Sequence, residues 1–283
     1  MKYFVLLAAI FFSFLSRAQE SFIFSDFSDL TNIQLNGQAA ILNPNGNDVL
    51  RLTDDLWQSS SAYLMEPITL QNLASFSAAF EFQITDPQGI SDNDGQGADG
   101  ISFIVQSNAN TVGGLGGAIG YGGVSNSIAI EFDTWRNSAY DGNNGNHVGI
   151  DVNGSLNSIA MTPVEARLNN GAVWTAWVDY NGLLEVVEVR LSQGSDRPDD
   201  PIVSTSVDLS EILGTDYAYV GFSSGTGAAG GDHDILSFAF NNDYQPINAI
   251  AVNEPNSFLV AIFIVLLRFT RRKNIMQVLI KRI

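Results

Sequence analysis

The chain of 283 residues contains no cysteine and few basic residues. Without disulfides a hydrophobic core must supply the stability, which favours a large sandwich over a small disulfide-rich scaffold. Lys and Arg total 13 against 30 Asp and Glu, giving a formal net charge of -17. The central region of the chain carries nearly all of the acid and little of the base, so it is a poor partner for nucleic acid or anionic membrane surfaces. Between Glu20 and Ser257 the only basic residues are Arg51, Arg136, Arg167, Arg190 and Arg197.

Helical periodicity is nearly absent, and only residues 208–213 offer about one helical turn. Alternating apolar runs, separated by Gly, Asn and Asp clusters, predict many short strands and therefore a single all-β sandwich or barrel. The pair Asn181-Gly182 predicts a hairpin with a type I′ turn. The clearest strands are predicted at 76–85, 100–106, 127–135, 147–154, 172–180, 183–193, 217–225 and 234–242.

The N-terminus predicts a secretory signal peptide over residues 1–18. Lys2 precedes an apolar run from Tyr3 to Leu15, and Ser16-Arg17-Ala18 provides a small-x-small cleavage site. The mature protein is therefore expected to be exported and to be extracellular or attached to the cell surface.

The C-terminus predicts a linker over 244–257, an anchor or sorting helix with a basic cluster over 258–273, and a short cytoplasmic-side tail over 274–283. The order Glu254-Pro255, an apolar run from Phe258 to Leu267 and the basic cluster ending at Lys273 resembles the PEP-CTERM sorting signal of Gram-negative bacteria. Asn253 stands where that signal usually has its first proline. We expect membrane association through this segment, and whether the tail is cut stays open.

The stretch from Ser127 to Gly154 combines an alternating strand with a polar loop. Glu131 and Asp133 point to one face, Asn137 and Asp141 lie in the loop, and His147 begins the next strand. Oxygen donors suit Ca²⁺ and an imidazole suits a transition metal such as Mn²⁺. A polar turn is the alternative, but an acid between apolar neighbours needs a buried partner, which a cation provides.

These residues resemble the metal-binding signature of the L-type lectins, which include the legume lectins and their bacterial relatives. The likeness extends over residues 20–243, because "GADGISFIVQ", "GGLGGAIGYGG" and "VGFSSGTGAAGGDHDILSFAF" occur in the family's order. The resemblance implies an antiparallel β-sandwich, a jelly roll of the concanavalin A type. It also implies a sugar site on loops beside a Ca²⁺ ion and a transition-metal ion.

Carried over by position, the resemblance implies two adjacent metal sites and one sugar site. Ca²⁺ is the more secure expectation and Mn²⁺ the second ion. The implied transition-metal ligands are Glu131, Asp133, Asp141 and His147. The implied Ca²⁺ ligands are Asp133, Asn137, Asp141 and the backbone carbonyl of Trp135. The implied carbohydrate-binding residues are Asp99, Gly117, Trp135, Asn137, Gly227 and Ala228.

The resemblance also implies a cis peptide bond between Ala98 and Asp99. The short loop from Thr226 to Gly231 resembles that of mannose-binding cargo receptors, so mannose- or glucose-type glycans are expected. His233 is expected to be structural, and Trp174 and Trp177 should lie on opposite faces of one strand, at least one of them in the core.

The sequence therefore predicts a non-catalytic, metal-dependent lectin whose partners are glycans. A weak single-sugar site would gain avidity from a homo-oligomer. A sandwich glycoside hydrolase is one alternative, but Trp135, Arg136 and Asn137 stand where the second catalytic Glu would be expected. An adhesive surface scaffold with a vestigial sugar site is the other. Asp99, Asn137 and Trp135 argue against it.

Overall fold

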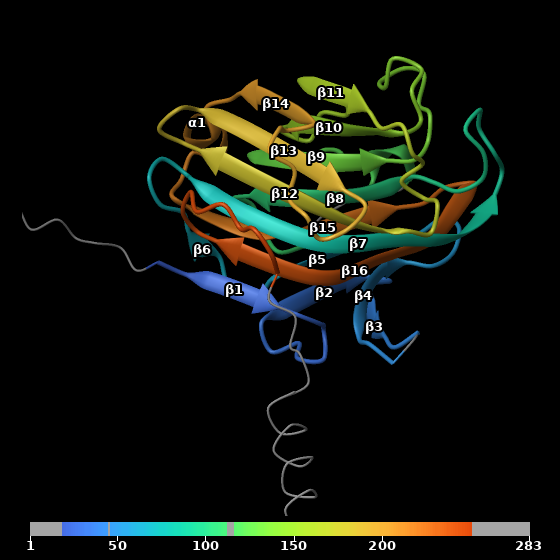
Figure 1. The fold of residues 1–283 in the computed structure, drawn as a ribbon, viewed down its shortest axis with the longest axis horizontal. Helices are drawn as coiled ribbons and strands as arrows, with labels where there is room; N and C mark the ends of the chain where they lie inside the picture. The colour runs from blue at the N-terminus through green and yellow to red at the C-terminus, as the bar shows by residue number, and fades with distance from the viewer. Residues whose placement is uncertain (1–18, 45, 112–115, 251–283) are drawn as a thin grey trace, which may run out of the picture.

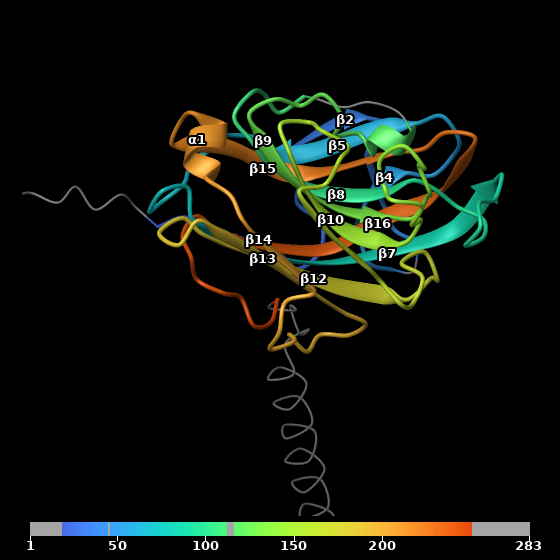
Figure 2. The same ribbon diagram turned by 90° about the horizontal axis from the view of Figure 1, so that it is seen from above.

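The structure is a computed structural model that describes residues 19–44, 46–111 and 116–250. Two antiparallel sheets face each other, as Figures 1 and 2 show. The first sheet has the order β14-β13-β12-β7-β16-β4-β3, with β1 added to β16. Its strands are β14 (Val203–Ser206), β13 (Val186–Ser192), β12 (Val173–Asn181), β7 (Phe76–Gly89), β16 (Ala229–Asn241), β4 (Val49–Thr53), β3 (Ala40–Leu42) and β1 (Ser21–Phe24).

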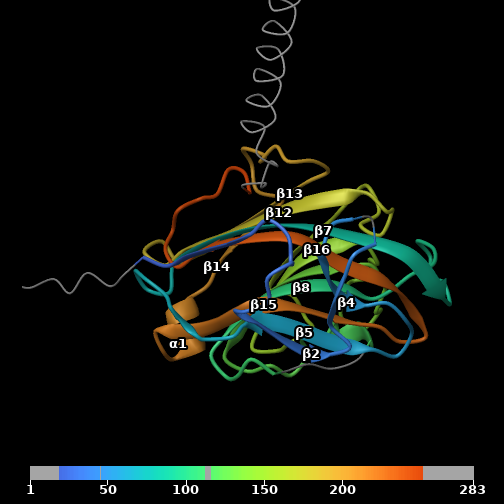
Figure 3. The same ribbon diagram turned by 90° about the horizontal axis from the view of Figure 1, so that it is seen from below.

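The second sheet has the order β11-β10-β9-β8-β15-β5-β2, with β6 added to β15. Figure 3, seen from the opposite side to Figure 2, again shows it as a separate layer. Its strands are β11 (Ala160–Pro163), β10 (His147–Val152), β9 (Ser127–Asp133), β8 (Gly100–Gln106), β15 (Tyr217–Gly225), β5 (Ser59–Leu64), β2 (Ile33–Gly37) and β6 (Ile68–Thr69). The described helices are the 3₁₀ turn η1 (Gly116–Ala118) and α1 (Leu209–Leu213).

The core fills the space between the two sheets and is rich in phenylalanine. Phe80 of β7 lies 5.0 Å from Phe222 of β15 between ring centroids, edge to face, and 5.7 Å from Phe132 of β9. Each such buried side chain contributes about 1.5 to 3 kcal/mol relative to exposure. The alternation of β9 places Ile128, Ile130 and Phe132 in this core, so the residues between them face away from it.

The outer face of the second sheet carries a smaller apolar cluster beneath the β8–β9 connection. Tyr121 and Val124 of that connection pack on Tyr63, Ile104 and Ala129 of the sheet. The connection is thereby held over the sheet, which brings η1 and its glycines toward the end of β9.

Each predicted strand occurs, although β13 begins at Val186 rather than at 183 and β16 at Ala229 rather than at 234, and α1 occupies the predicted helical turn. The prediction of a type I′ turn at Asn181-Gly182 was wrong. β12 and β13 do form a hairpin, but Asn181 pairs with Val186, which leaves four residues in the connection. The positive φ falls on Glu185, at 54°. Gly182 has a different role, because a β-carbon there would lie 2.0 Å from the carbonyl oxygen of Leu73.

Trp174 and Trp177 lie on opposite faces of β12, as predicted, and both are buried. Trp174 belongs to the core. On the other face, Gln245 of the predicted linker donates its backbone N–H to Ser77 Oγ at 3.0 Å.

The predicted signal peptide, anchor helix and cytoplasmic-side tail fall outside the described residues. Within residues 19–44, 46–111 and 116–250, no helix has the length and apolarity needed to cross a membrane.

Candidate functional site

The polar face of β9 and β10 gathers the predicted metal ligands. In the register of these strands His147 stands opposite Asp133, and Gly149 opposite Glu131. Ligand atoms of Glu131, Asp133 and His147 all lie within 4.8 Å of one another, and all three residues are buried. His147 Nε2 is 3.1 Å from Glu131 Oε1. The same-face prediction for the two acids is confirmed.

The loop after β9 brings the remaining predicted ligands to this cluster. The backbone N–H of Trp135 donates to Asp133 Oδ1 at 2.7 Å, and that of Asn137 donates to Asp141 Oδ2. Asp141 is not one of the three residues whose ligand atoms lie within 4.8 Å of one another. Its charge nevertheless acts on them, because it raises the pKa of Asp133. Among the described residues, Asn137 Oδ1 is buried without a hydrogen-bond donor.

Burial makes the negative charge of this cluster costly. It raises the pKa of Asp133 well above its ordinary value, and the charges of Glu131 and Asp141 raise it further. Burial likewise raises the pKa of Asp141 to about 6. Burial opposes ionisation of Glu131 too, but the hydrogen bond and charge of His147 hold its pKa below the ordinary value. A bound cation would favour every ionised carboxylate here.

The donor set fits metal ions. Carboxylates and the donor-less Asn137 oxygen are the hard ligands of Ca²⁺, whereas the buried imidazole of His147 adds a nitrogen suited to a transition metal. Glu131 and Asp133 are both buried in this cluster with His147, which favours a metal site over the acid pair of a glycoside hydrolase.

Three residues that support the cluster were missed from the sequence. Asp151 is buried beside Glu131, and burial together with that neighbour raises its pKa to about 9. Gly149 leaves room for Glu131, because a β-carbon there would lie 2.3 Å from Glu131 Oε1. The sequence could have indicated Gly149 and Asp151, because residues two apart on a strand share a face and both follow His147 at this spacing. Asp92, which accepts the backbone N–H of Arg136 at 2.9 Å, gave none, because 44 residues separate the pair.

Several of the predicted sugar-binding residues lie next to the predicted metal ligands. The Ala98–Asp99 peptide bond is cis, as the resemblance implied. The backbone carbonyl oxygen of Asp99 accepts the N–H of Thr134, the residue that follows β9, at 2.9 Å. Its Oδ2 atom has no hydrogen-bond donor among the described residues. Burial, and secondarily the charge of Asp141, raises the pKa of Asp99 to about 7.

Two glycine-containing loops border this carboxylate. A β-carbon at Gly117 would lie 2.7 Å from Asn137 Nδ2, so a larger residue here would require the Asn137 amide to shift. A β-carbon at Gly227 would lie 4.0 Å from Asp99 Oδ2. Ala228 follows in the same loop, where its carbonyl oxygen accepts the N–H of Ile90 at 3.1 Å. Gly227 thus borders the Asp99 carboxylate, as does Gly116, whose β-carbon would lie 3.7 Å from Asp99 Oδ2. Gly117, which adjoins Asn137, follows Gly116 in the chain, and Ala228 follows Gly227.

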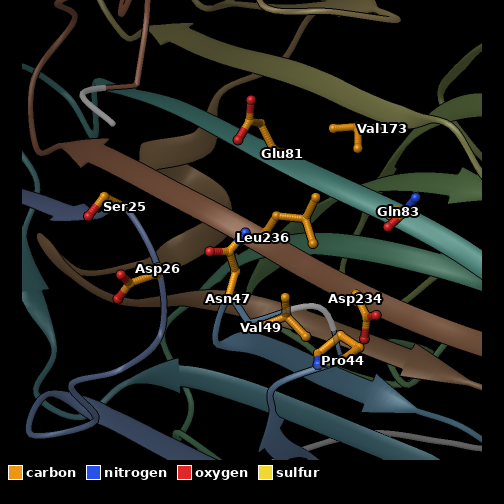
Figure 4. A pocket seen from close by; sticks show the side chains of 10 residues that line it. All are labelled: Ser25, Asp26, Pro44, Asn47, Val49, Glu81, Gln83, Val173, Asp234 and Leu236. Carbon is orange, nitrogen blue, oxygen red and sulfur yellow. The ribbon is translucent and has the colours of Figure 1, made fainter. Parts of the chain in front are cut away.

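A separate hollow of about 380 Å³ lies on the first sheet, between β7, β16 and the segments near β1 and β4 (Figure 4). Its acids already have partners. Asp234 accepts two hydrogen bonds from Arg51 at 2.7 Å, and Glu81 accepts one from Ser237 at 2.7 Å. This hollow has no unsatisfied carboxylate, so the cluster at β9 and β10 is the better candidate site.

The legume lectin domain model matches residues 19–256. The chain belongs to this family. The winged bean acidic lectin, solved with methyl-α-D-galactose, is similar with a TM-score of 0.68 and 29% identity, covering 79% of this chain and 98% of that one. Lectin I of Ulex europaeus, solved with the methyl glycoside of α-L-fucose, has a TM-score of 0.64 and 26% identity, covering 79% of this chain and 97% of that one.

Among curated proteins, the L-type lectin-domain containing receptor kinase VIII.1 of Arabidopsis thaliana is 32% identical over 238 residues. The match covers 77% of this chain and 32% of that protein, so the chain spans about a third of the kinase's length. Lectin 1 of Laburnum alpinum is 35% identical, over 64% of this chain and 74% of the lectin. The family match identifies residues 19–256 as a legume lectin domain.

Proposed function

We propose that the chain is a Ca²⁺-dependent lectin that holds one glycan residue over Asp99, with a transition-metal ion in the adjacent site. The observation that carries this proposal is the donor-less Oδ2 of Asp99, which Gly116 and Gly227 border and on which the charge of Asp141 acts. An ionised carboxylate accepts hydroxyl donors from a sugar, and charge-assisted bonds of this kind are the stronger ones.

Metal ions would act on the sugar site through the loop after β9. Asp133, Asn137, Asp141 and the Trp135 carbonyl would hold Ca²⁺, while Glu131 and His147 with the shared acids would hold the transition metal. Asn137 also adjoins Gly117, so the residue proposed to bind metal forms a wall of the proposed sugar site. Bound Ca²⁺ would supply positive charge that fixes the loop, and Trp135 would offer an apolar face to the sugar.

The glycan class is proposed as mannose- or glucose-type, as found on exopolysaccharides or other cells. The short loop from Thr226 to Gly231 supports it. Two similar lectins were solved with galactose and fucose glycosides, so a test must include those sugars. We also propose export, display at the cell surface through residues 258–273 after a PEP-CTERM-like sorting signal, and self-association for avidity.

The deciding experiment compares the parent with Asp99→Asn on a dense array of mannose, glucose, galactose and fucose glycans. The variant keeps the size of the side chain but replaces an acceptor oxygen with a donor. Each charge-assisted bond lost costs about 1.5 to 3 kcal/mol, roughly ten- to hundredfold in affinity. The melting temperature should not fall, because the variant removes a buried charge. Equal binding by parent and variant would exclude Asp99 from the site and favour the adhesive scaffold.

A further inference from the structure

Trp57, in the β4–β5 connection, has a conformation that folding alone does not explain. Its side chain is 66% exposed, so the indole gains little from burial. Its φ is 58°, in the left-handed region that is unfavourable for a bulky residue. Glycine would adopt this backbone conformation at no steric cost. An exposed aromatic residue in an unfavourable backbone conformation points to a contact outside the fold.

The backbone around Trp57 is fixed to the loop that borders the sugar site. Trp57 N donates to the carbonyl oxygen of Gly227 at 3.1 Å. Gln58 N donates to Thr226 Oγ1 at 2.9 Å, and Thr226 N donates back to the carbonyl oxygen of Gln58 at 2.9 Å. Thr226 Oγ1 donates to the carbonyl oxygen of Asp55 at 2.6 Å. The indole is therefore carried by a loop that is pinned on both sides of it.

This loop places Trp57 one step away from the proposed sugar site. Trp57 touches Gly227, and Gly227 borders the Asp99 carboxylate. Ile90, which is 55% exposed, is bound to Ala228 on the same loop. Two exposed apolar residues, Trp57 and Ile90, are thus hydrogen-bonded through their backbones to Gly227 and Ala228.

We propose that Trp57 is the platform for a second sugar residue, linked to the one that occupies the Asp99 site. The ligand of this subsite is an oligosaccharide, and the inference rests on the lectin function proposed above. An aromatic ring covers the C–H face of a sugar, and its few torsions make ordering inexpensive. Because the loop is already pinned, little further entropy is lost on binding.

The test uses full-length protein with Ca²⁺ and measures affinity by calorimetry. The probes are methyl α-D-mannoside and methyl α-D-galactoside, each paired with a linear trisaccharide of the same sugar. Trp57→Gly removes the indole and relieves the backbone. We expect its melting temperature to equal or exceed the parent's, its monosaccharide affinity to be unchanged, and its trisaccharide affinity to fall roughly three- to tenfold. Trp57→Phe should retain part of the trisaccharide gain.

Leu183→Ala is the matched control, because Leu183 is 71% exposed in the β12–β13 connection, away from the sugar loops. It should change neither affinity. An unchanged ratio of trisaccharide to monosaccharide affinity in Trp57→Gly, or an equal loss of both, overturns the subsite while leaving Asp99 in place. A parent that binds no probe overturns the lectin proposal and the subsite together.

Discussion

A β-carbon on Gly117 would lie 2.7 Å from the Nδ2 atom of Asn137, so the glycine of one loop sets the position of the amide of another. Gly117→Ala should therefore displace Asn137, the proposed Ca²⁺ ligand. The Ca²⁺ affinity should fall at least tenfold, which corresponds to roughly 1.4 kcal/mol. The φ of Gly117 is not positive, so added backbone strain is not the reason. Calorimetric titration of the metal-free protein with Ca²⁺ measures the effect.

Gly227→Ala is the control for this prediction. It adds the same methyl group at the same rim, but the nearest atoms would lie 3.8 and 4.0 Å away, which is ordinary contact. Its Ca²⁺ affinity should match that of the parent. Equal Ca²⁺ affinity in Gly117→Ala and the parent would show that Asn137 does not bind Ca²⁺.

His233 should make stability depend on pH. It is fully buried and bonded to Thr53 Oγ1 at 2.7 Å, and burial lowers its pKa to about 4. The unfolded chain binds its proton near pH 6.5, so between pH 6.5 and 4 the unfolded state holds more protons. The free energy of unfolding therefore decreases as pH falls through this window, by up to about 1.4 kcal/mol per pH unit.

His233→Gln should lack this contribution. Urea unfolding of both proteins between pH 4 and pH 7 gives the slope of the free energy of unfolding against pH for each. The difference between the two slopes is free of the contribution of the acids, because both proteins contain the same acids. The variant is expected to be less stable at pH 7 through the lost Thr53 bond, yet to have the shallower slope. Parallel slopes would mean that His233 binds its proton over the same pH range in the folded and unfolded states, so that burial does not lower its pKa.

The fold was predictable because local patterns and tertiary structure agree here. The alternation of β9 both buries Ile128, Ile130 and Phe132 and turns Glu131 and Asp133 outward. The turn after Asn181 was not predictable from the local sequence, because the carbonyl of Leu73, which is distant in the chain, lies against Gly182. Trp57 gave no periodic signal either. Its place beside Gly227 depends on pairing between the β4–β5 connection and a loop far along the chain.

The C-terminal segment should determine attachment. A chain truncated after Pro246 keeps β16, which ends at Asn241, and the Gln245–Ser77 contact. Expressed with its own N-terminus in a Gram-negative host, it should appear as folded lectin in the medium, whereas the full chain stays with the membrane fraction. Fractionation and immunoblotting distinguish these. Firm membrane association of the truncated chain would contradict an anchor beyond residue 257.

On the proposed function, the buried acids and the sugar-binding loop depend on the same cations. The most direct experiment measures two properties of the full-length protein, its binding to a dense glycan array and its melting temperature. Both are measured in Ca²⁺ and Mn²⁺, then in excess EDTA, and again after both ions are restored. Without metal, the buried Glu131, Asp133 and Asp141 lose the cation that favours their ionised forms, so melting temperature and glycan binding should fall together and recover together. Unchanged glycan binding in excess EDTA would contradict the account.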